Sequence, residues 1–429
     1  MLLRHGATRA THATRTASTA RTAAATAAAA RFTRASSTAG PSTPRAAPQP
    51  ERSVIEIAGP DAPKFLNGLL CKNVDTLKGG YTGFLNASGR VLHPAFVIPI
   101  DPKTNRYLVS HVPGPDHPAP LDKYLKPFRL RSKVRIRDVT AEWDVYAAWG
   151  GAGADTNAPA ATWRYGNAGA AERLWTWSGE PAPLGLGEKE QGCWDLRAGW
   201  GAAGLGRHVI VPKGEKLSLF SNYDTATTDE YNLRRMVLGV PEGPAEVVPG
   251  VALPLETDMD IHGGVDVRKG CYVGQELTVR TYHTGATRKR ILPVRLFPLS
   301  GSAALSSVAE GSTSGPSRGG AQGVDITFTP SSDSASKKPR SAGKLLALHG
   351  DSTAVGVALI RLEFADRAWW ADGAADGTVA DWASGAKGTL TAEIGGTRWG
   401  VWVGKGEAYA EALANLPPPR EEAAEEEEE

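Results

Sequence analysis

The chain has 429 residues, of which 41% are hydrophobic, and this length exceeds the usual ceiling for one domain. The formal net charge of +2 gives no support to a nucleic-acid-binding surface, and no stretch approaches the roughly 18 apolar residues that a membrane span needs. The three cysteines, Cys71, Cys193 and Cys271, form no C-x-x-C pair, which argues against disulfides and against a self-contained zinc or iron-sulfur site. We therefore expect two folded units in a reducing compartment.

Residues 1–50 differ in composition from the rest of the chain. They contain seven arginines and no acidic residue, which is typical of a mitochondrial transit peptide, and we expect a mature start between Phe32 and Ala47. The alternative is a disordered basic tail for nucleic acid, although arginines dispersed among alanines lack the density of a binding patch. The opposite end is rich in glutamate, and residues 406–429 are expected to form a solvated acidic tail.

From Ser53 onward the sequence pattern predicts short strands and helices in alternation within a first domain, residues 51–286. Strands are predicted over 53–57, 81–85, 91–100, 133–136, 143–149, 173–177 and 208–211. Helices are predicted after Asp61, over 121–130 and over 229–238, and residues 150–171 are predicted to be a loop. The tryptophans between 143 and 200 are interpreted as core anchors rather than as a ligand cage.

A second, smaller β domain is predicted over residues 287–405. Residues 291–297 and 355–362 have the β-branched, alternating pattern of paired strands. Between them, residues 300–343 are dominated by Ser, Gly, Ala, Pro and Lys, apart from a short apolar island at 324–328. We expect this stretch to be a disordered insertion, because it cannot bury enough surface to offset its ordering entropy.

The segment 268–277, R-K-G-C-Y-V-G-Q-E-L, is the most informative of the chain. It places the thiol of Cys271 beside Arg268 and Lys269 and just before a predicted helix start. Neighbouring positive charge and the positive end of a helix dipole both favour a thiolate, and Gly270 allows another backbone or a ligand to come close. We interpret Cys271 as a reactive thiol or a metal ligand; a cysteine that only packs in the core is the alternative.

Several stretches together resemble the YgfZ/GcvT-like family, and more narrowly its mitochondrial branch of late-acting iron-sulfur cluster assembly factors. The main signature is carried by residues 253–256, 260, 269–276, 283–285 and 288–290. Further stretches agree with it in colinear order, at 65–69, 84–90, 130–134, 195–197, 204–207, 231, 235 and 239–243.

The resemblance implies an α+β, aminomethyltransferase-like folate-binding fold, with mixed α+β lobes around a central cleft and a C-terminal β-barrel domain. It implies tetrahydrofolate and a transient iron-sulfur cluster shared with a partner as the candidate cofactors. It also implies that Cys271 is a transient ligand or redox thiol. The site residues carried over from the motif are Lys269, Gly270, Cys271, Tyr272, Gly274, Gln275 and Glu276.

By the same resemblance, the protein is expected in the mitochondrial matrix, where A-type carrier proteins and recipient 4Fe-4S enzymes such as aconitase and lipoyl synthase would be its partners. One thiol cannot fill the ligand sites of a cluster, so partner cysteines would supply the others.

The alternative function is a folate-dependent aminomethyltransferase or other one-carbon transferase. Enzymes with this fold carry a carboxylate in the stretch after the turn at Gly89, where it can serve proton transfers. Here that stretch is Arg90-Val91-Leu92-His93-Pro94. His93 is interpreted as structural rather than as a substitute base. An assembly factor is therefore favoured over an enzyme.

Overall fold

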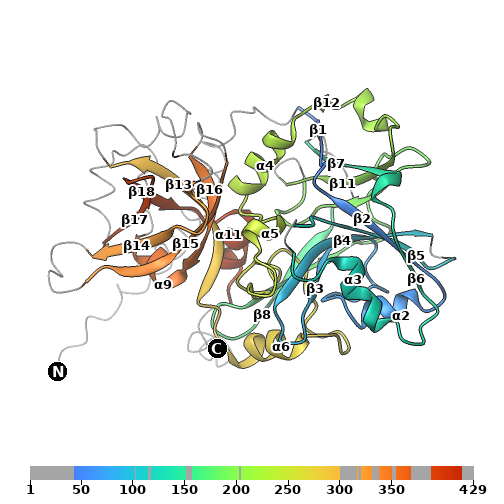
Figure 1. Ribbon diagram of the computed structural model, residues 1–429, viewed down its shortest axis with the longest axis horizontal. Helices are drawn as coiled ribbons and strands as arrows, with labels where there is room; N and C mark the ends of the chain where they lie inside the picture. The colour runs from blue at the N-terminus through green and yellow to red at the C-terminus, as the bar shows by residue number, and fades with distance from the viewer. Residues whose placement is uncertain are drawn as a thin grey trace, which may run out of the picture.

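The computed structural model describes residues 43–101, 103–114, 117–150, 157–201, 204–299, 316, 320–330, 338–349, 354–368 and 388–417. Two five-stranded sheets occupy one end of the molecule and a closed barrel occupies the other (Figure 1). The predicted α+β fold with a C-terminal barrel is thus confirmed. Most of the predicted transit peptide, residues 1–42, and the end of the predicted acidic tail, residues 418–429, lie outside the described residues.

The first sheet is antiparallel throughout and carries two short helices on one face. Its strand order is β3 (Gly80–Leu85), β4 (Val91–Asp101), β5 (Arg106–His111), β2 (Ser53–Ala58) and β6 (Arg135–Asp138). Ile55 and Ile57 of β2 pack on one side with α2 (Ala62–Asn67) and α3 (Leu121–Leu125). Val54 faces the other side, where it belongs to a core shared with the second sheet, because successive side chains of a strand alternate between faces.

The second sheet begins earlier in the chain than the sequence predicted. Its strand order is β10 (Gln191–Trp194), β11 (Arg207–Pro212), β7 (Trp143–Trp149), β1 (Arg45–Pro48) and β12 (Asp224–Thr225). β1 pairs with β7 on one side and with β12 on the other, and Ala46 and Ala47 are completely buried. The prediction that residues 1–50 are only leader and linker is therefore wrong for β1, whose two alanines are buried in separate core clusters on the two faces of the sheet.

The barrel includes a strand from within the predicted insertion. Its order is β13 (Lys289–Pro298), β16 (Val355–Arg361), β15 (Arg340–His349), β14 (Asp325–Pro330), β17 (Gly388–Ile394) and β18 (Thr397–Val403), closed by pairing of β18 with β13. The apolar island forms β14, which buries Ile326 and Phe328 inside the barrel. The prediction of disorder over 300–343 is wrong at β14 and at the start of β15, because a strand needs only two or three inward apolar residues. Its other residues, 316, 320–324 and 338–339 excepted, lie outside the described part of the chain.

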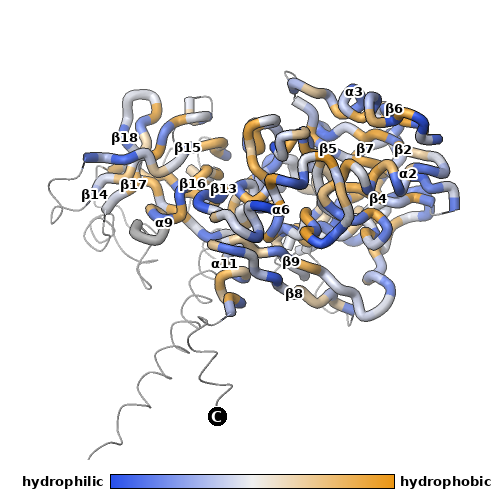
Figure 2. Tube along the Cα trace, turned by 90° about the horizontal axis from the view of Figure 1, so that it is seen from below, coloured by the Kyte–Doolittle hydropathy of each residue, from blue (hydrophilic) through white to orange (hydrophobic). Residues whose placement is uncertain are grey.

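Two helices join the barrel to the sheets. α4 (Thr228–Val237) begins at a capping box made by Thr227 and Glu230, and its Met236 and Val237 pack against barrel strands β13 and β16. α11 (Glu407–Ala414) follows the last barrel strand and lies along the hairpin β8 (Ala160–Tyr165) and β9 (Ala171–Thr176), as Figure 2 shows. Two predictions are corrected here: the acidic tail begins with a packed helix, and the predicted loop 150–171 contains β8.

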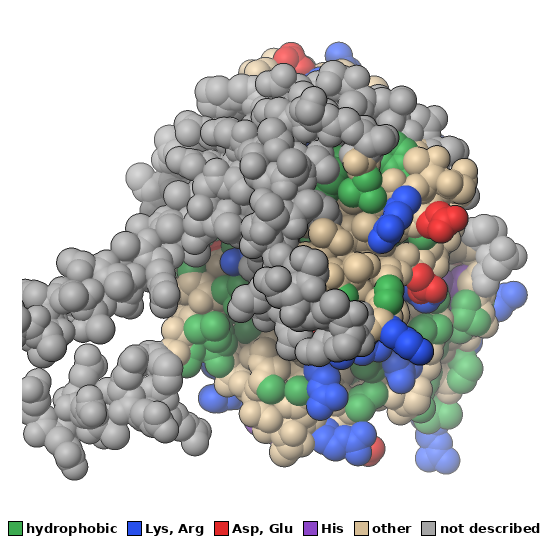
Figure 3. Space-filling view, turned by 90° about the vertical axis from the view of Figure 1, so that its left-hand side faces the viewer, with side chains coloured by type: hydrophobic (Ala, Val, Ile, Leu, Met, Phe, Trp, Pro, Cys, Tyr) green, Lys and Arg blue, Asp and Glu red, His purple; other side chains and the backbone are tan. Residues whose placement is uncertain are grey.

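A buried ion cluster connects the first barrel strand, β13, to a loop of the first domain. Arg290, at the start of β13, donates to the carboxylates of Asp258 at 2.7 Å and Asp260 at 2.8 Å and is fully buried. Both acids belong to the loop that follows the signature residues 253–256. Asp260 and Arg290 are themselves signature residues, and their ion pair connects this loop to a barrel strand. Figure 3 shows the barrel end, where basic, acidic and hydrophobic side chains of the described residues are interspersed. Within the described chain, no helix is long and apolar enough to cross a membrane.

Candidate functional site

Cys271 lies on an exposed loop directly before helix α6 (Gln275–Thr284). The predicted helix start is confirmed, and its N-cap is Gly274, with φ +81°. Cys271 itself is three residues ahead of the cap, so its thiol is set by the loop rather than by the first turn of the helix. The loop is therefore the element that positions the thiol.

Gly274 fixes this loop against the hairpin turn between β3 and β4. A Cβ at Gly274 would stand 2.3 Å from the carbonyl oxygen of Asn86, and one at Gly89 would stand 2.9 Å from the carbonyl oxygen of Gly274. Both glycines also have positive φ, at which other residues are strained. Two backbones thus meet at a distance that only glycine permits.

Lys269 points into the protein and ties the loop to the end of α2. Its Nζ donates to the carbonyl oxygens of Asn67, Leu70 and Lys72 at 2.9, 2.8 and 2.9 Å. Burial, which disfavours the charged form, lowers the pKa of this ammonium to about 8. The prediction that Lys269 activates the thiol as a flanking cation is therefore corrected: its ammonium is occupied by three carbonyls and serves to hold the loop.

The other motif residues divide into buried supports and exposed neighbours of the thiol. Tyr272 is buried, and its N–H donates to Oε1 of Gln275 at 3.1 Å. Glu276 is exposed in the first turn of α6. Gly270 is exposed, and a Cβ there would meet nothing within 4 Å, so its predicted role in a close backbone approach belongs to Gly274 instead. The motif thus presents Cys271 on a rigid base.

Cys271 is the exposed one of the three thiols. Cys71 and Cys193 are buried, and burial raises the pKa of the Cys71 thiol to about 12 and raises that of Cys193 as well. Among the described residues, no group of three or more His, Cys, Asp or Glu could hold a metal ion. Cys271 can thus be reached from solvent, and it can provide a single thiolate ligand.

The central cleft between the two sheets is occupied by charged side chains of the chain itself. Arg52 donates to Glu242 at 2.6 Å, and Arg197 donates to the same carboxylate at 2.5 Å and to Asp195 at 2.6 Å. Tyr231 also donates to Glu242, at 2.8 Å. Burial alone would raise the pKa of Glu242, but the neighbouring guanidinium groups of Arg52 and Arg197 hold that pKa well below its usual range. The carboxylate is ionised and fully engaged.

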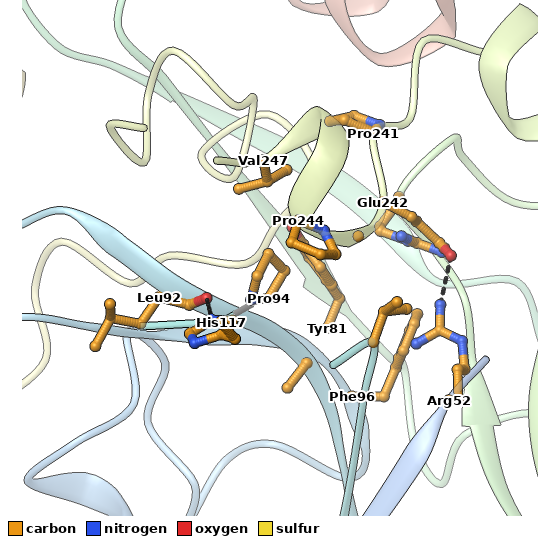
Figure 4. A pocket seen from close by; sticks show the side chains of 14 residues that line it. Arg52, Tyr81, Leu92, Pro94, Phe96, His117, Pro241, Glu242, Pro244 and Val247 are labelled. Carbon is orange, nitrogen blue, oxygen red and sulfur yellow. Dashed lines mark hydrogen bonds and ion pairs between the residues drawn. The ribbon is translucent and has the colours of Figure 1, made fainter. Parts of the chain in front are cut away.

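The space left in this cleft does not fit a folate. Figure 4 shows Tyr81, Phe96, Pro244 and Val247 converging beside the Arg52–Glu242 pair. The cavity among them has a volume of about 20 Å³, enough for about one water molecule. Sites for ligands of drug size usually measure roughly 300–1,000 Å³. The described residues that line this cavity therefore do not provide the tetrahydrofolate site that the resemblance implied.

His93 is buried beside the cleft, where its ring stacks on that of His117 and meets that of His111 edge-on. Its ring is 4.0 Å from that of His117 and 5.2 Å from that of His111. Burial, followed by the neighbouring histidines, lowers the pKa of His93 to about 3. The ring is neutral at physiological pH and accordingly acts as a packing group, in keeping with its structural interpretation.

The sequence pattern indicates no role for the residues of this ion network. Asp195, Arg197, Tyr231 and Glu242 were noted only as satellites of the family signature. Arg52 was not noted at all. The available signal was a set of charged residues within otherwise apolar stretches, which is what buried ion networks require.

Comparisons with known proteins agree with this architecture. No protein-family profile matches the chain. It is 54% identical over 378 residues to a protein of Cryptococcus neoformans var. neoformans serotype D named iron-sulfur cluster assembly factor IBA57 homolog, mitochondrial, covering 87% of this chain and 99% of that one. The protein of the same name from Neurospora crassa is 36% identical over 337 residues, covering 73% of this chain and 68% of that one.

A solved structure supports the fold. Aminomethyltransferase T of the glycine cleavage system from Bartonella henselae superposes with a TM-score of 0.53 at 10% identity, covering 88% of both chains. At that identity the likeness concerns the fold alone. The Cryptococcus relative, in contrast, is matched over 99% of its length at 54% identity. The chain therefore belongs to the mitochondrial IBA57 family of iron-sulfur cluster assembly factors.

Proposed function

We propose that this protein acts in the mitochondrial matrix as a late-acting iron-sulfur cluster assembly factor, in which Cys271 supplies one ligand to a cluster that it shares with an A-type carrier protein. The observation that carries this proposal is the single exposed thiol on a loop fixed by Lys269 and Gly274. The cluster is cargo, destined for recipient 4Fe-4S enzymes such as aconitase and lipoyl synthase.

The chemistry of the site favours a shared cluster over a stored one. Clusters of this kind are held by several thiolates, whereas the other two thiols of the chain are buried. Coordination of iron by Cys271 releases the thiol proton to solvent and transfers no electron. Because the partner supplies the other ligands, the cluster can leave with the partner when one iron–sulfur bond to Cys271 breaks.

The matrix location requires removal of the leader before β1. Arg45–Pro48 is paired on both sides, so cleavage inside it would take a strand from the sheet. We expect the mature chain to begin between Phe32 and Pro44. N-terminal sequencing of the protein recovered from mitochondria tests this, and an intact Met1 or a mature start beyond Pro44 would contradict it.

The direct test is anaerobic mixing of the protein with a cluster-loaded A-type carrier, read by visible absorption and native mass spectrometry. The wild-type chain should form a heterocomplex that contains iron and sulfide. Cys271→Ser should abolish that complex with little change in melting temperature, because the side chain is exposed.

Cys193→Ala is the matched control, since it removes a buried thiol that solvent does not reach. It should form the iron-bearing complex even where it lowers the melting temperature. Cells that carry only the Cys271→Ser chain should lose aconitase activity and protein lipoylation together. Full restoration of both by Cys271→Ser would refute the proposal.

A further inference from the structure

An open groove lies next to the Cys271 loop and has no role in the fold described so far. Its volume is about 870 Å³, and its apolar walls come from Phe65 and Leu69, Phe128 and Leu130, and Val273. These residues belong to three separate segments of the chain: α2 and the turn after it, η1 (Lys126–Phe128) and the turn after it, and the motif loop. The groove thus brings apolar side chains from three segments of the chain to one place on the surface.

Leu130 is the most conspicuous residue of this groove. Its side chain is 87% exposed, the highest value among the exposed large hydrophobic residues of the described chain. Its φ is +42°, a region that is unfavourable for a leucine. An apolar side chain held this far out of the protein at an unfavourable φ is available for contact with another molecule.

The rim of the groove is basic. Lys64 and Arg131 line it, and the exposed Arg129 and Lys133 flank it. In the described structure, none of these four side chains takes part in an ion pair. The one acidic residue of the lining, Asp61, is occupied by the backbone N–H of Lys133 at 2.7 Å. The charge therefore suits an acidic occupant.

The groove is continuous with the thiol. The N–H of Val273 donates to the carbonyl of Gly68 at 3.0 Å, and both residues line the groove. Lys269 binds the carbonyls of Asn67 and Leu70, at the end of the same helix. Cys271 is two residues from Val273, so at most about 7 Å of chain separates it from the groove wall. A protein that shares a cluster at Cys271 is therefore within reach of this groove.

We propose that the groove docks the protein that supplies the remaining cluster ligands, through an acidic segment of that protein that carries a large apolar side chain. This inference rests on the function proposed above. Leu130, Phe65 and Val273 would cover the apolar side chain, and Lys64 and Arg131 would pair with the acids. Docking then orients the partner's thiols toward Cys271, which a single iron–sulfur bond cannot do.

The test uses a cluster-free A-type carrier as the probe, titrated calorimetrically into the full chain. Leu130→Gly should raise Kd at least about tenfold, as removal of a central apolar anchor does. Its melting temperature should hold or rise, because glycine accepts the positive φ. Lys64→Glu combined with Arg131→Glu should weaken binding similarly and reduce its salt dependence. Leu416→Gly and Lys216→Glu, exposed changes elsewhere, should leave Kd unchanged.

Cys271→Ser separates this inference from the proposed function. It should bind the cluster-free carrier with wild-type affinity while forming no iron-bearing complex. If groove variants bind normally while Cys271→Ser loses the cluster, the docking inference alone fails. If Cys271→Ser still yields the iron-bearing complex, the proposed function fails, whatever the groove variants do.

Two other occupants are decided by the same set of variants. Groove variants that leave carrier affinity unchanged but make residues 418–429 more sensitive to protease would assign the groove to the chain's own Glu-rich end and overturn the inference. If the groove variants lose binding to cardiolipin-containing vesicles while their affinity for the carrier is unchanged, the groove binds a membrane surface. That result would also overturn the inference.

Discussion

Replacing Gly274 with alanine should displace the loop that carries Cys271. At φ +81°, an alanine costs roughly 1–2 kcal/mol in backbone strain. Its Cβ would also stand 2.3 Å from the Asn86 carbonyl oxygen, and relieving such overpacking typically costs another 1–3 kcal/mol. The free energy of unfolding should thus fall by about 2–5 kcal/mol, which corresponds to a melting temperature lower by roughly 4–20 °C.

Gly270→Ala is the matched control, because it adds the same methyl group four residues away, where it meets no atom within 4 Å. Its melting temperature should stay near that of the wild type. Thermal unfolding followed by circular dichroism measures both variants, and cluster sharing with the carrier should weaken only in Gly274→Ala. A Gly274→Ala chain that melts within 1–2 °C of wild type, by roughly the same scale, would refute the close-approach argument.

Four further outcomes are expected. Limiting iodoacetamide should label Cys271 first, as mass spectrometry of peptides can establish, because the other two thiols are buried; earlier labelling of either would contradict this. His93 and His111, with pKa values near 3 and 4 against 6.5 when unfolded, stay neutral while the unfolded chain takes up protons, so stability falls as pH drops below 6.5, by about 2 kcal/mol for each between pH 7 and pH 5; urea unfolding at the two pH values measures this, and an unchanged free energy would refute it. Deleting 325–330 should open the barrel and unfold that domain, visible as lost cooperativity in calorimetry, whereas an unchanged melting transition would show that β14 is dispensable. Calorimetric titration with tetrahydrofolate should give no binding heat, and micromolar binding would show that the cleft opens.

Local patterns predicted most of the elements correctly, because their signals lie within a few residues. The alternation of 53–57 and 143–149 corresponds to β2 and β7, and the hairpin at the turn 86–89 is confirmed. Elements fixed by distant partners were missed. β1 has only two small alanines to mark it, and its stability comes from β7, about 100 residues further along the chain.

The motif at Cys271 could be recognised from the sequence, but the structural role of each of its residues could not. The position of Lys269 next to Cys271 in the chain predicted an electrostatic effect on the thiol. In the fold, its side chain reaches three carbonyls of another segment. Adjacency along the chain gives no information on the direction of a side chain in an irregular loop, and that direction decides which atoms a charge stabilises.

The aminomethyltransferase-like fold does not by itself determine the chemistry of the central cleft. A cleft that accepts a folate and one that does not can share an architecture, because ligand binding depends on the few side chains that line the cleft. Here Arg52, Glu242 and Arg197 form a buried network in which each charge is paired. Removing one partner would leave an uncompensated buried charge rather than an open site. Restoring a folate pocket would therefore require neutralising the network as a unit, and substitution of Glu242 alone should destabilise the chain without creating affinity for folate.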